Sequence, residues 1–190
     1  MRKYILFLGC ATVLFSCSQK EPLSEFPEKS AYEALGDSIS QITFDTLSST
    51  MKNKMQESGP VAALRFCNTK AIQLTGLYTS PTLVSVKRSS SKIRNVHNKP
   101  DEWELAALKK FEANPGITRI SEKHADGTIR YYRPIIIMEN CLKCHGNPET
   151  FSDSLKSTLH ALYPGDKAIN YKPGELRGIW SLTFKPESNF

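Results

Sequence analysis

The spacing of hydrophobic positions predicts helices in the first half of the chain. Residues 30–58 carry apolar side chains at helical spacing, which predicts one long helix. We expect it to pack through a stripe made of Leu35, Ile39, Ile42, Leu47, Met51 and Met55. Gly59 and Pro60 then break the pattern, and residues 61–75 continue as a second helix.

The second half of the chain has the short apolar runs that are typical of strands. Strands are expected over residues 82–87, 117–123, 128–138 and 177–184. Asp126 and Gly127 stand between the second and third of these, which predicts a β-hairpin. Pro134 cannot donate a ladder hydrogen bond, so its strand should lie at an edge or bend there.

Shorter helices are predicted between these strands. Asp101 and Glu104 form a capping-box pattern that starts a helix over residues 101–113. Two further helical stretches are expected at residues 141–145 and 152–162. The order of elements indicates an α+β fold, with an antiparallel sheet, flanking helices and a long N-terminal helix.

The first residues predict export and a lipid anchor. Arg2 and Lys3 precede an apolar run over residues 4–15, which has the shape of a signal peptide. The sequence Leu-Phe-Ser-Cys at residues 14–17 resembles a lipobox, which makes residues 1–16 the predicted lipoprotein signal and Cys17 the lipidated residue. The alternative is a plain secretory signal with an incidental cysteine.

The predicted order along the chain is a signal, a tether and one domain. Residues 17–29 are polar and hold two prolines, so they are expected to be a lipid-anchored tether, and residues 30–190 form a single domain. We expect the domain on the periplasmic side of a bacterial membrane, with the outer membrane preferred over the inner one.

Composition and charge exclude several classes of protein. Hydrophobic residues make up 39% and charged residues 23%, which excludes wholesale disorder and fibrous repeats. The net charge is +6, but the positive charges are scattered and no run reaches five like charges. No nucleic-acid partner is therefore expected.

The cysteines carry the clearest chemical signal. Apart from Cys10 and Cys17, the chain holds Cys67, Cys141 and Cys144, an odd number for an exported domain. Cys141, Cys144 and His145 form a C-x-x-C-H motif, which is typical of c-type haem attachment. Two thiols one helical turn apart can each form a thioether with a haem vinyl group, and the adjacent histidine can ligate the iron.

Two other interpretations of this motif fit the sequence less well. A thioredoxin-like dithiol would need strands that alternate with helices, and the predicted order does not supply them. A zinc site would need a second pair of ligands, whereas His97, His124 and His160 are scattered singly. We therefore predict one covalent haem c.

Four stretches resemble a known family, the haem-binding domains labelled domain of unknown function 3365, or Tll0287-like. They are AALRFCNTKAIQL, the Arg-Ser to Trp-Glu pattern over residues 88–104, Tyr-Arg-Pro leading into ENCLKCHGNP, and YKPGELRGIWSLTF. Val96 stands where the family pattern often has proline. The resemblance implies a PAS-like sheet with one haem c, and Cys67 as the axial ligand opposite His145.

Several supporting residues have alternative roles. Cys67 could instead be a small buried apolar residue, and His97, His124, His160 and Met138 are rival ligands, with His97 first among them. Arg88 and Arg94 could pair with haem propionates or be solvated surface residues. Trp103, Tyr131 and Tyr132 could line the cofactor or belong to the core.

The resulting hypothesis is an exported, lipid-anchored monohaem c protein that acts in redox sensing or electron transfer. Its partner would be a redox protein whose identity the sequence does not define. A haem-based gas sensor with a displaceable ligand is the first alternative. A haem peroxidase is the second, but no distal acid or base can be assigned, so the sequence favours a redox or sensor haem protein over an enzyme without excluding an enzyme.

Overall fold

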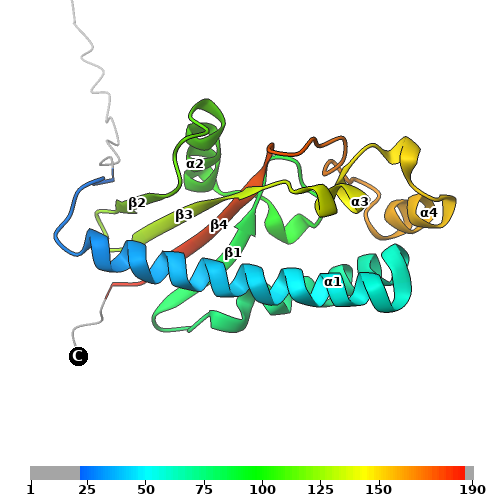
Figure 1. The fold of residues 1–190 in the computed structure, drawn as a ribbon. Coiled ribbons are helices and arrows are strands. Elements are labelled where there is room, and N and C mark those ends of the chain that lie inside the picture. Colours follow the sequence, from blue (N-terminus) through cyan, green and yellow to red (C-terminus); the bar gives the residue numbers. More distant parts are fainter. Residues whose placement is uncertain (1–21, 187–190) are drawn as a thin grey trace, which may run out of the picture.

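The computed structural model of the protein describes residues 22–186, so the predicted signal at 1–16 and Cys17 lie outside the described residues. Its helices are α1 (Lys29–Thr75), α2 (Glu102–Ala113), α3 (Leu142–His145) and α4 (Asp153–Leu162). Its strands are β1 (Val84–Ser89), β2 (Ile120–Lys123), β3 (Ile129–Ile136) and β4 (Leu176–Phe184). The long N-terminal helix and the later strands confirm the α+β prediction (Figure 1).

The four strands form one antiparallel sheet in the order β1-β4-β3-β2. The predicted hairpin is present as β2 and β3, with Gly127 at φ +81° in its turn. Pro134 pairs with Ile179 of β4 but lies beyond the last residue of β3 that pairs with β2, Tyr132. Strand β3 is therefore an edge locally, and its register shifts between Ile135 and Ile136.

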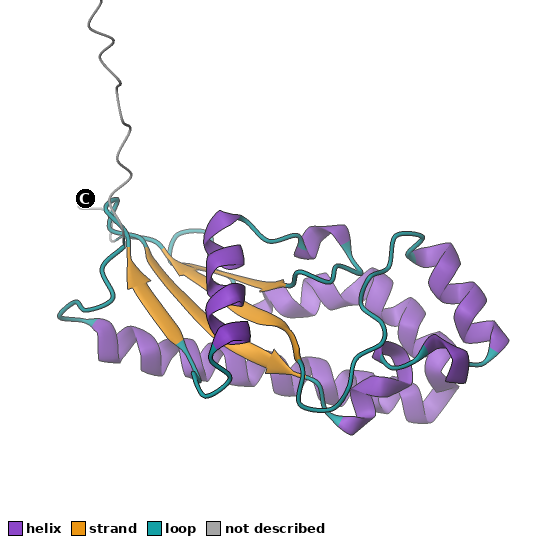
Figure 2. Ribbon diagram, turned by 90° about the horizontal axis from the view of Figure 1, so that it is seen from above, coloured by secondary structure: helices purple, strands orange, loops and turns teal. Residues whose placement is uncertain are grey.

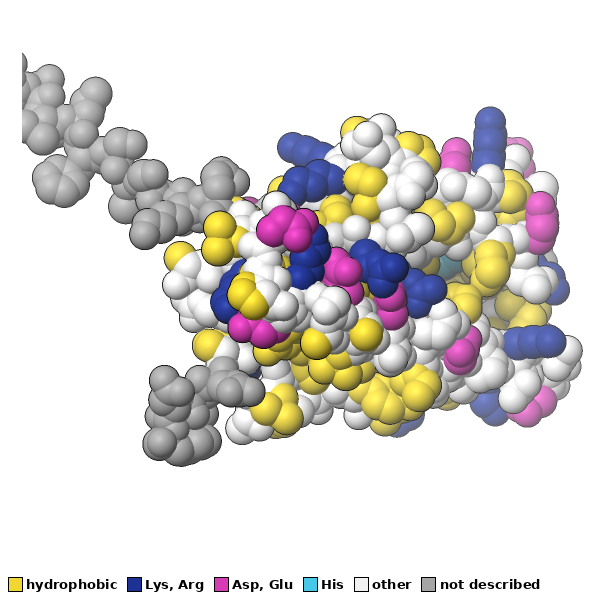
Figure 3. All heavy atoms as spheres, turned by 60° about the vertical axis from the view of Figure 1, so that its left-hand side comes forward, with side chains coloured by type: hydrophobic (Ala, Val, Ile, Leu, Met, Phe, Trp, Pro, Cys, Tyr) yellow, Lys and Arg dark blue, Asp and Glu magenta, His cyan; other side chains and the backbone are white. Residues whose placement is uncertain are grey.

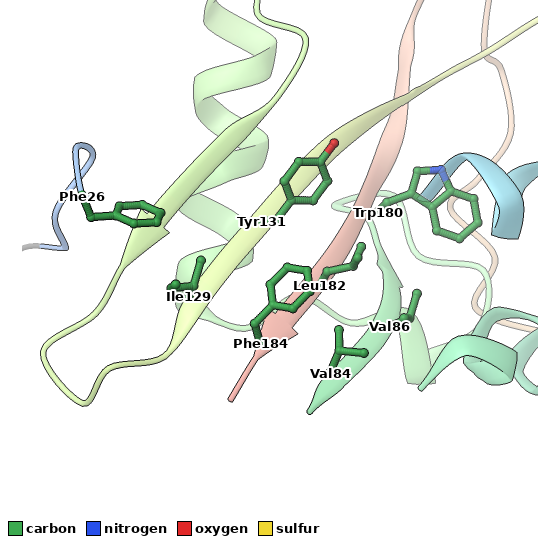
Figure 4. Close-up of a cluster of buried hydrophobic side chains, with 8 residues drawn as sticks. All are labelled: Phe26, Val84, Val86, Ile129, Tyr131, Trp180, Leu182 and Phe184. Atoms are coloured by element: carbon green, nitrogen blue, oxygen red, sulfur yellow. The ribbon is translucent and has the colours of Figure 1, made fainter. Parts of the chain in front are cut away.

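Helices cover both faces of the sheet (Figure 2). On the α1 face, Tyr131, Trp180 and Leu182 belong to a buried cluster that Figure 4 shows in close-up. On the opposite face, Tyr132 and Ile179 pack with Ala107, Leu108 and Phe111 of α2. Neighbouring residues of a strand point to opposite faces, which places Tyr131 and Tyr132 in two different halves of the core.

The predicted apolar stripe of α1 is partly wrong. Leu35 and Ile42 are 47% and 49% exposed, while Gly36, Ser40 and Thr43 are buried against the sheet. The helix lies so close to β3 that a Cβ atom on Gly36 would come within 2.5 Å of the Tyr131 ring. Small residues therefore form the closest contact, while Ile39 and Leu47 of the predicted stripe also pack against the buried cluster.

The break at Gly59 turns α1 into a hairpin of two arms. Gly59 has φ +77°, a conformation that L-residues with a Cβ rarely adopt, and Pro60 follows it. The chain reverses here, because Cys67 in the second arm contacts Met51 in the first. The structure confirms the two helices that the sequence predicted.

The part of the predicted tether that the structure describes packs on the domain. The Leu23 and Lys123 backbones exchange two hydrogen bonds of 2.8 Å, and Phe26 is only 8% exposed in the α1-side core. The domain therefore begins before residue 30. Phe26 supplies apolar burial that the polar, proline-containing sequence around it does not indicate.

The described surface mixes charges of both signs. On the face in Figure 3, Lys and Arg side chains lie among Asp and Glu side chains across the middle of the molecule. Ion pairs such as Lys110 with Glu122 and Arg130 with Asp101 contribute to this pattern. Within residues 22–186, no helix has the length and apolar character needed to cross a membrane.

Candidate functional site

A cavity of about 770 Å³ lies among the two arms of α1, the ends of β1, β3 and β4, and α3. This volume falls in the range of about 300–1,000 Å³ that is usual for ligand sites. All six predicted cofactor-binding residues line it: Cys67, Arg88, Arg94, Cys141, Cys144 and His145. Three separate segments of the sequence therefore meet at one cavity.

The C-x-x-C-H motif is positioned by a short helical turn and by the loop before β4. A 3-10 turn at Glu139–Cys141 leads directly into α3, which contains Cys144 and His145. Both thiols are free and half-buried, and Cys141 packs against a small cluster formed by Ile137, Ala168 and Tyr171. The two sulfur atoms thus belong to one wall of the cavity.

One backbone hydrogen bond orients the His145 ring. Its Nδ1 lies 2.7 Å from the carbonyl oxygen of Ala168, which can only accept, so Nδ1 carries the proton. Burial, helped by the nearby guanidinium of Arg94, lowers the pKa of His145 well below its usual value, so the ring is neutral at pH 7. The Nε2 lone pair is then available to a metal ion.

Cys67 faces the same cavity from the second arm of α1. Burial raises the pKa of its thiol, and the positive charge of Arg88 acts in the opposite direction. Its sulfur lies 3.1 Å from the sulfur of Met51. The residue is half-buried on the face of the arm that also presents Leu64 and Ala71 to the cavity.

Arg88 has an unsatisfied donor in this environment. Its Nε atom is buried and has no hydrogen-bond partner in the described structure, while its Nη2 lies at 3.5 Å from the Ala71 carbonyl oxygen. Burial lowers the pKa of the guanidinium, and Cys67 counteracts that effect. Buried cationic donors normally have an anionic partner, so this cavity suits a ligand that carries carboxylates.

Arg94, by contrast, already has protein partners. It pairs with Asp166 at 2.8 Å and donates to the carbonyl oxygens of Cys144 and Ala168 at 2.7 and 3.1 Å. These bonds tie the loop after β1 to α3, the predicted attachment helix. The geometry favours a positioning role for Arg94 over either alternative from the sequence, and its contact with a propionate stays a prediction.

Two cavity residues were missed by the sequence analysis. Arg177 lines the cavity and donates to the Ser90 hydroxyl at 2.7 Å and the Lys92 carbonyl at 3.2 Å. Burial lowers the pKa of the Arg177 guanidinium. Its place in the motif YKPGELRG was the signal that could have identified it. Met51 was assigned only to the packing stripe of α1.

The rival ligands are distributed differently from the expectation. His97 is exposed and does not line the cavity, although its neighbours Asn95 and Asn98 do. His124 contacts Trp103 at another pocket, and His160 is exposed on α4. Met138 lines the cavity but is 47% exposed. His97 is therefore not the first alternative to Cys67.

The other interpretations of the motif gain no support. Within residues 22–186, no group of three or more His, Cys, Asp or Glu side chains is arranged to hold a metal ion, which leaves zinc without a ligand set there. The sheet is antiparallel, whereas the thioredoxin-like dithiol was expected with alternating strands and helices.

The aromatic residues considered for the cofactor site, Trp103, Tyr131 and Tyr132, pack in or beside the core.

The donor set fits the chemistry of a covalently attached haem. The cavity combines a pair of thiols one turn apart, a neutral imidazole, a third thiol and an unsatisfied guanidinium. In a haem, the two vinyl groups would match the pair of thiols, and the two axial positions of the iron would match the imidazole and the third thiol. A propionate would match the guanidinium.

Comparisons with known proteins agree with this arrangement. The crystal structure of the cyanobacterial heme-protein Tll0287 is 22% identical and covers 86% of this chain and 98% of that chain, with a TM-score of 0.59. That likeness shows a shared fold. A search of curated proteins found no significant match. The model of the Tll0287-like family matches residues 28–185, and the chain therefore belongs to the Tll0287-like family.

Proposed function

We propose that this protein is an exported, lipid-anchored monohaem c protein that acts in redox sensing or electron transfer. In this proposal Cys141 and Cys144 hold the haem covalently, and His145 and Cys67 are the axial ligands. The family membership and the fold shared with a heme-protein support the cofactor. The bound group would supply one-electron chemistry, and the protein would orient and bury it.

The observation that carries the proposal is the state of His145 on the cavity wall. The bond from Nδ1 to the Ala168 carbonyl oxygen leaves Nε2 as the free donor, directly beside two free thiols. Metal-binding histidines are usually held through the other ring nitrogen in this way. A histidine that served only the core would not need the adjacent pair of unpaired thiols.

The side of the cavity formed by the second arm of α1 favours a redox role over a gas sensor or a peroxidase. Cys67 presents a sulfur to the cavity, and burial raises the pKa of its thiol despite the nearby Arg88. A coordinating metal ion would deprotonate this thiol to a thiolate, which is a strong ligand. A gas sensor needs an open or easily displaced position. A peroxidase needs a distal acid or base, and the histidines that could serve as one, His97, His124 and His160, lie away from the cavity, although Asp45 lines it.

The fold also suits a domain that is tethered at one end. Residues 22–28 lie at the end of the sheet beside β2, and α3 and α4 lie at the other end (Figure 1). A lipid on Cys17 would therefore hold the domain by the end far from the cavity. The attachment helix would be left free to meet a redox partner on the periplasmic side.

The test is whether the chain carries one covalent haem. The full chain is produced in a bacterium that has the haem c assembly machinery, and haem is counted by pyridine haemochrome and by mass spectrometry. We expect one haem per chain that survives denaturation and acid-acetone extraction. The Cys141→Ala/Cys144→Ala variant should lose covalent haem, whereas Cys67→Ala should retain it as a matched cysteine control. An exported wild-type chain without haem would contradict the proposal.

A further inference from the structure

A second sulfur donor lies beside Cys67 in the same cavity. The Cys67 thiol donates to the Met51 thioether, and the two sulfur atoms are 3.1 Å apart. We infer that Met51 is the alternative axial ligand on the Cys67 side of the haem, and that it takes this position when Cys67 does not hold it. This inference rests on the proposed function, because it names a further ligand at the same site.

The hairpin of α1 creates this pair. Met51 lies eight residues before Gly59 and Cys67 lies eight residues after it, so the reversal at Gly59 brings them to the same level of the two arms. Both residues also line the cavity. An iron atom within reach of one sulfur is thus within reach of the other by side-chain rotation alone.

Methionine is suited to such an exchange. Its side chain is unbranched, with three rotatable bonds and a polarizable sulfur, so it can move by an ångström or two without a backbone change. A thioether is also an established haem ligand opposite histidine. The histidines outside the motif lie away from the cavity, and the group that contacts the Cys67 sulfur is the Met51 thioether.

The other cavity methionines are less well placed. Met55 lies one helical turn beyond Met51 on the same arm, and Met138, two residues after β3, is 47% exposed. Of the three, Met51 is the one that contacts the Cys67 sulfur. This difference makes Met55 and Met138 matched controls for any effect of losing a methionine from the cavity.

The pair would give one haem two electronic states. An anionic thiolate stabilises ferric iron, whereas a neutral thioether favours ferrous iron and raises the reduction potential. A carrier that shuttles electrons works best with an unchanged ligand pair, while a sensor needs two distinguishable states. Two sulfur donors at one position therefore favour sensing between the two roles proposed above.

The experiment follows the methionine methyl groups of the haem-loaded full chain. The chain has only four methionines, so labelling with methyl-¹³C-methionine gives a simple spectrum. The ring current of a ferrous low-spin haem shifts the methyl group of a ligated methionine far upfield. In Cys67→Ala we expect one such resonance, lost in Cys67→Ala/Met51→Leu and retained in Cys67→Ala/Met55→Leu. Cys67→Ser serves as the near-isosteric background if the alanine variant does not fold.

The outcomes separate this inference from the proposed function. Haem is counted in every sample, and a haem-free wild type would refute both. A loaded Cys67→Ala protein with no upfield methyl resonance, or one whose resonance survives Met51→Leu, would refute the Met51 ligand alone. An upfield resonance in the ferrous wild type that Met51→Leu removes would support Met51 and remove Cys67 from the ferrous site.

Discussion

The Arg94 guanidinium lies 2.8 Å from the Asp166 carboxylate, and the two side chains are only 9% and 10% exposed. Arg94 also donates to the carbonyl oxygens of Cys144 and Ala168, and the Ala168 oxygen accepts the Nδ1 proton of His145. One ion pair therefore fixes both the attachment helix and the carbonyl group that orients the proposed iron ligand.

The first prediction is that Arg94→Ala destabilises the protein strongly. Removing one partner of a buried ion pair leaves the other charge unpaired, which costs about 3–5 kcal/mol. For a domain of this size we expect Tm to fall by roughly 10 °C, since about 2–4 °C corresponds to each kcal/mol. Thermal unfolding followed by circular dichroism measures this change.

An exposed ion pair provides the control for Arg94. Lys156 lies 3.8 Å from Asp153 on α4, and both side chains face solvent. Pairs of this kind contribute little, so Lys156→Ala should melt almost as the wild type does. If Arg94→Ala and Lys156→Ala had the same small effect, the buried pair would not be what holds the attachment helix.

The second prediction concerns the close approach of α1 to the sheet. Gly→Ala inside a helix usually stabilises it by about 1 kcal/mol, but at Gly36 the new methyl group would overlap the Tyr131 ring. Overpacking costs about 1–3 kcal/mol, so Gly36→Ala should lower the free energy of unfolding. Denaturant titration tests this, with the exposed Ser38→Ala on the same helix as control. Equal stability of the two variants would show that α1 can move away from β3.

Local signals in the sequence were enough to predict several elements. The Asp101 side chain accepts from the Glu104 backbone, and the Glu104 carboxylate accepts from the Asp101 backbone, as the capping-box pattern required. Gly127 turns the β2–β3 hairpin, and Gly59 bends α1. Each of these features depends on residues within a few positions of one another, which is why the pattern alone identifies them.

Contacts between distant residues could not be predicted in the same way. Arg94 and Asp166 are 72 positions apart, and nothing local in either segment indicates the other. The predicted stripe of α1 was wrong at Leu35 and Ile42, because the face of the helix closest to the sheet also contains small buried residues. Hydrophobic periodicity considers only large apolar residues. Cys67 was predicted as a ligand through the family resemblance and not from the spacing of residues.

The third prediction is that Cys17 carries the membrane anchor. Each buried methylene of a lipid adds about 0.8 kcal/mol, so two or more acyl chains should keep the protein with membranes during fractionation. Cys17→Ala should be unprocessed or released in soluble form, while Cys10→Ala should fractionate as the wild type does. Labelling with radioactive palmitate is the direct measurement, and an unlabelled wild-type protein would leave an ordinary secretory signal.

The fourth prediction is that Arg88 raises the reduction potential of the loaded protein. A buried positive charge favours the reduced site, which carries one positive charge less than the oxidised one. Arg88→Gln should therefore lower the midpoint potential by on the order of 60 mV, or about 1.4 kcal/mol for one electron. Arg88→Lys keeps the charge and should shift it less. The exposed Lys109→Gln on α2 controls for net charge, and an equal shift in that variant would exclude a specific role.

The fifth prediction is that Cys67→Ala changes the iron site without releasing the haem. Cys141 and Cys144 still hold the cofactor in this variant, so haem content should match the wild type. Loss of an anionic ligand removes the preference for ferric iron, and the potential should rise by on the order of 100 mV or more, within the span of about 0.8 V that axial ligands control. Carbon monoxide should bind the ferrous variant more readily, because a neutral thioether is displaced more easily than a thiolate and an open position requires no displacement. An electron paramagnetic resonance spectrum of ferric Cys67→Ala that matched the wild type would remove Cys67 from the ligand set, and Met51 would become the next residue to mutate.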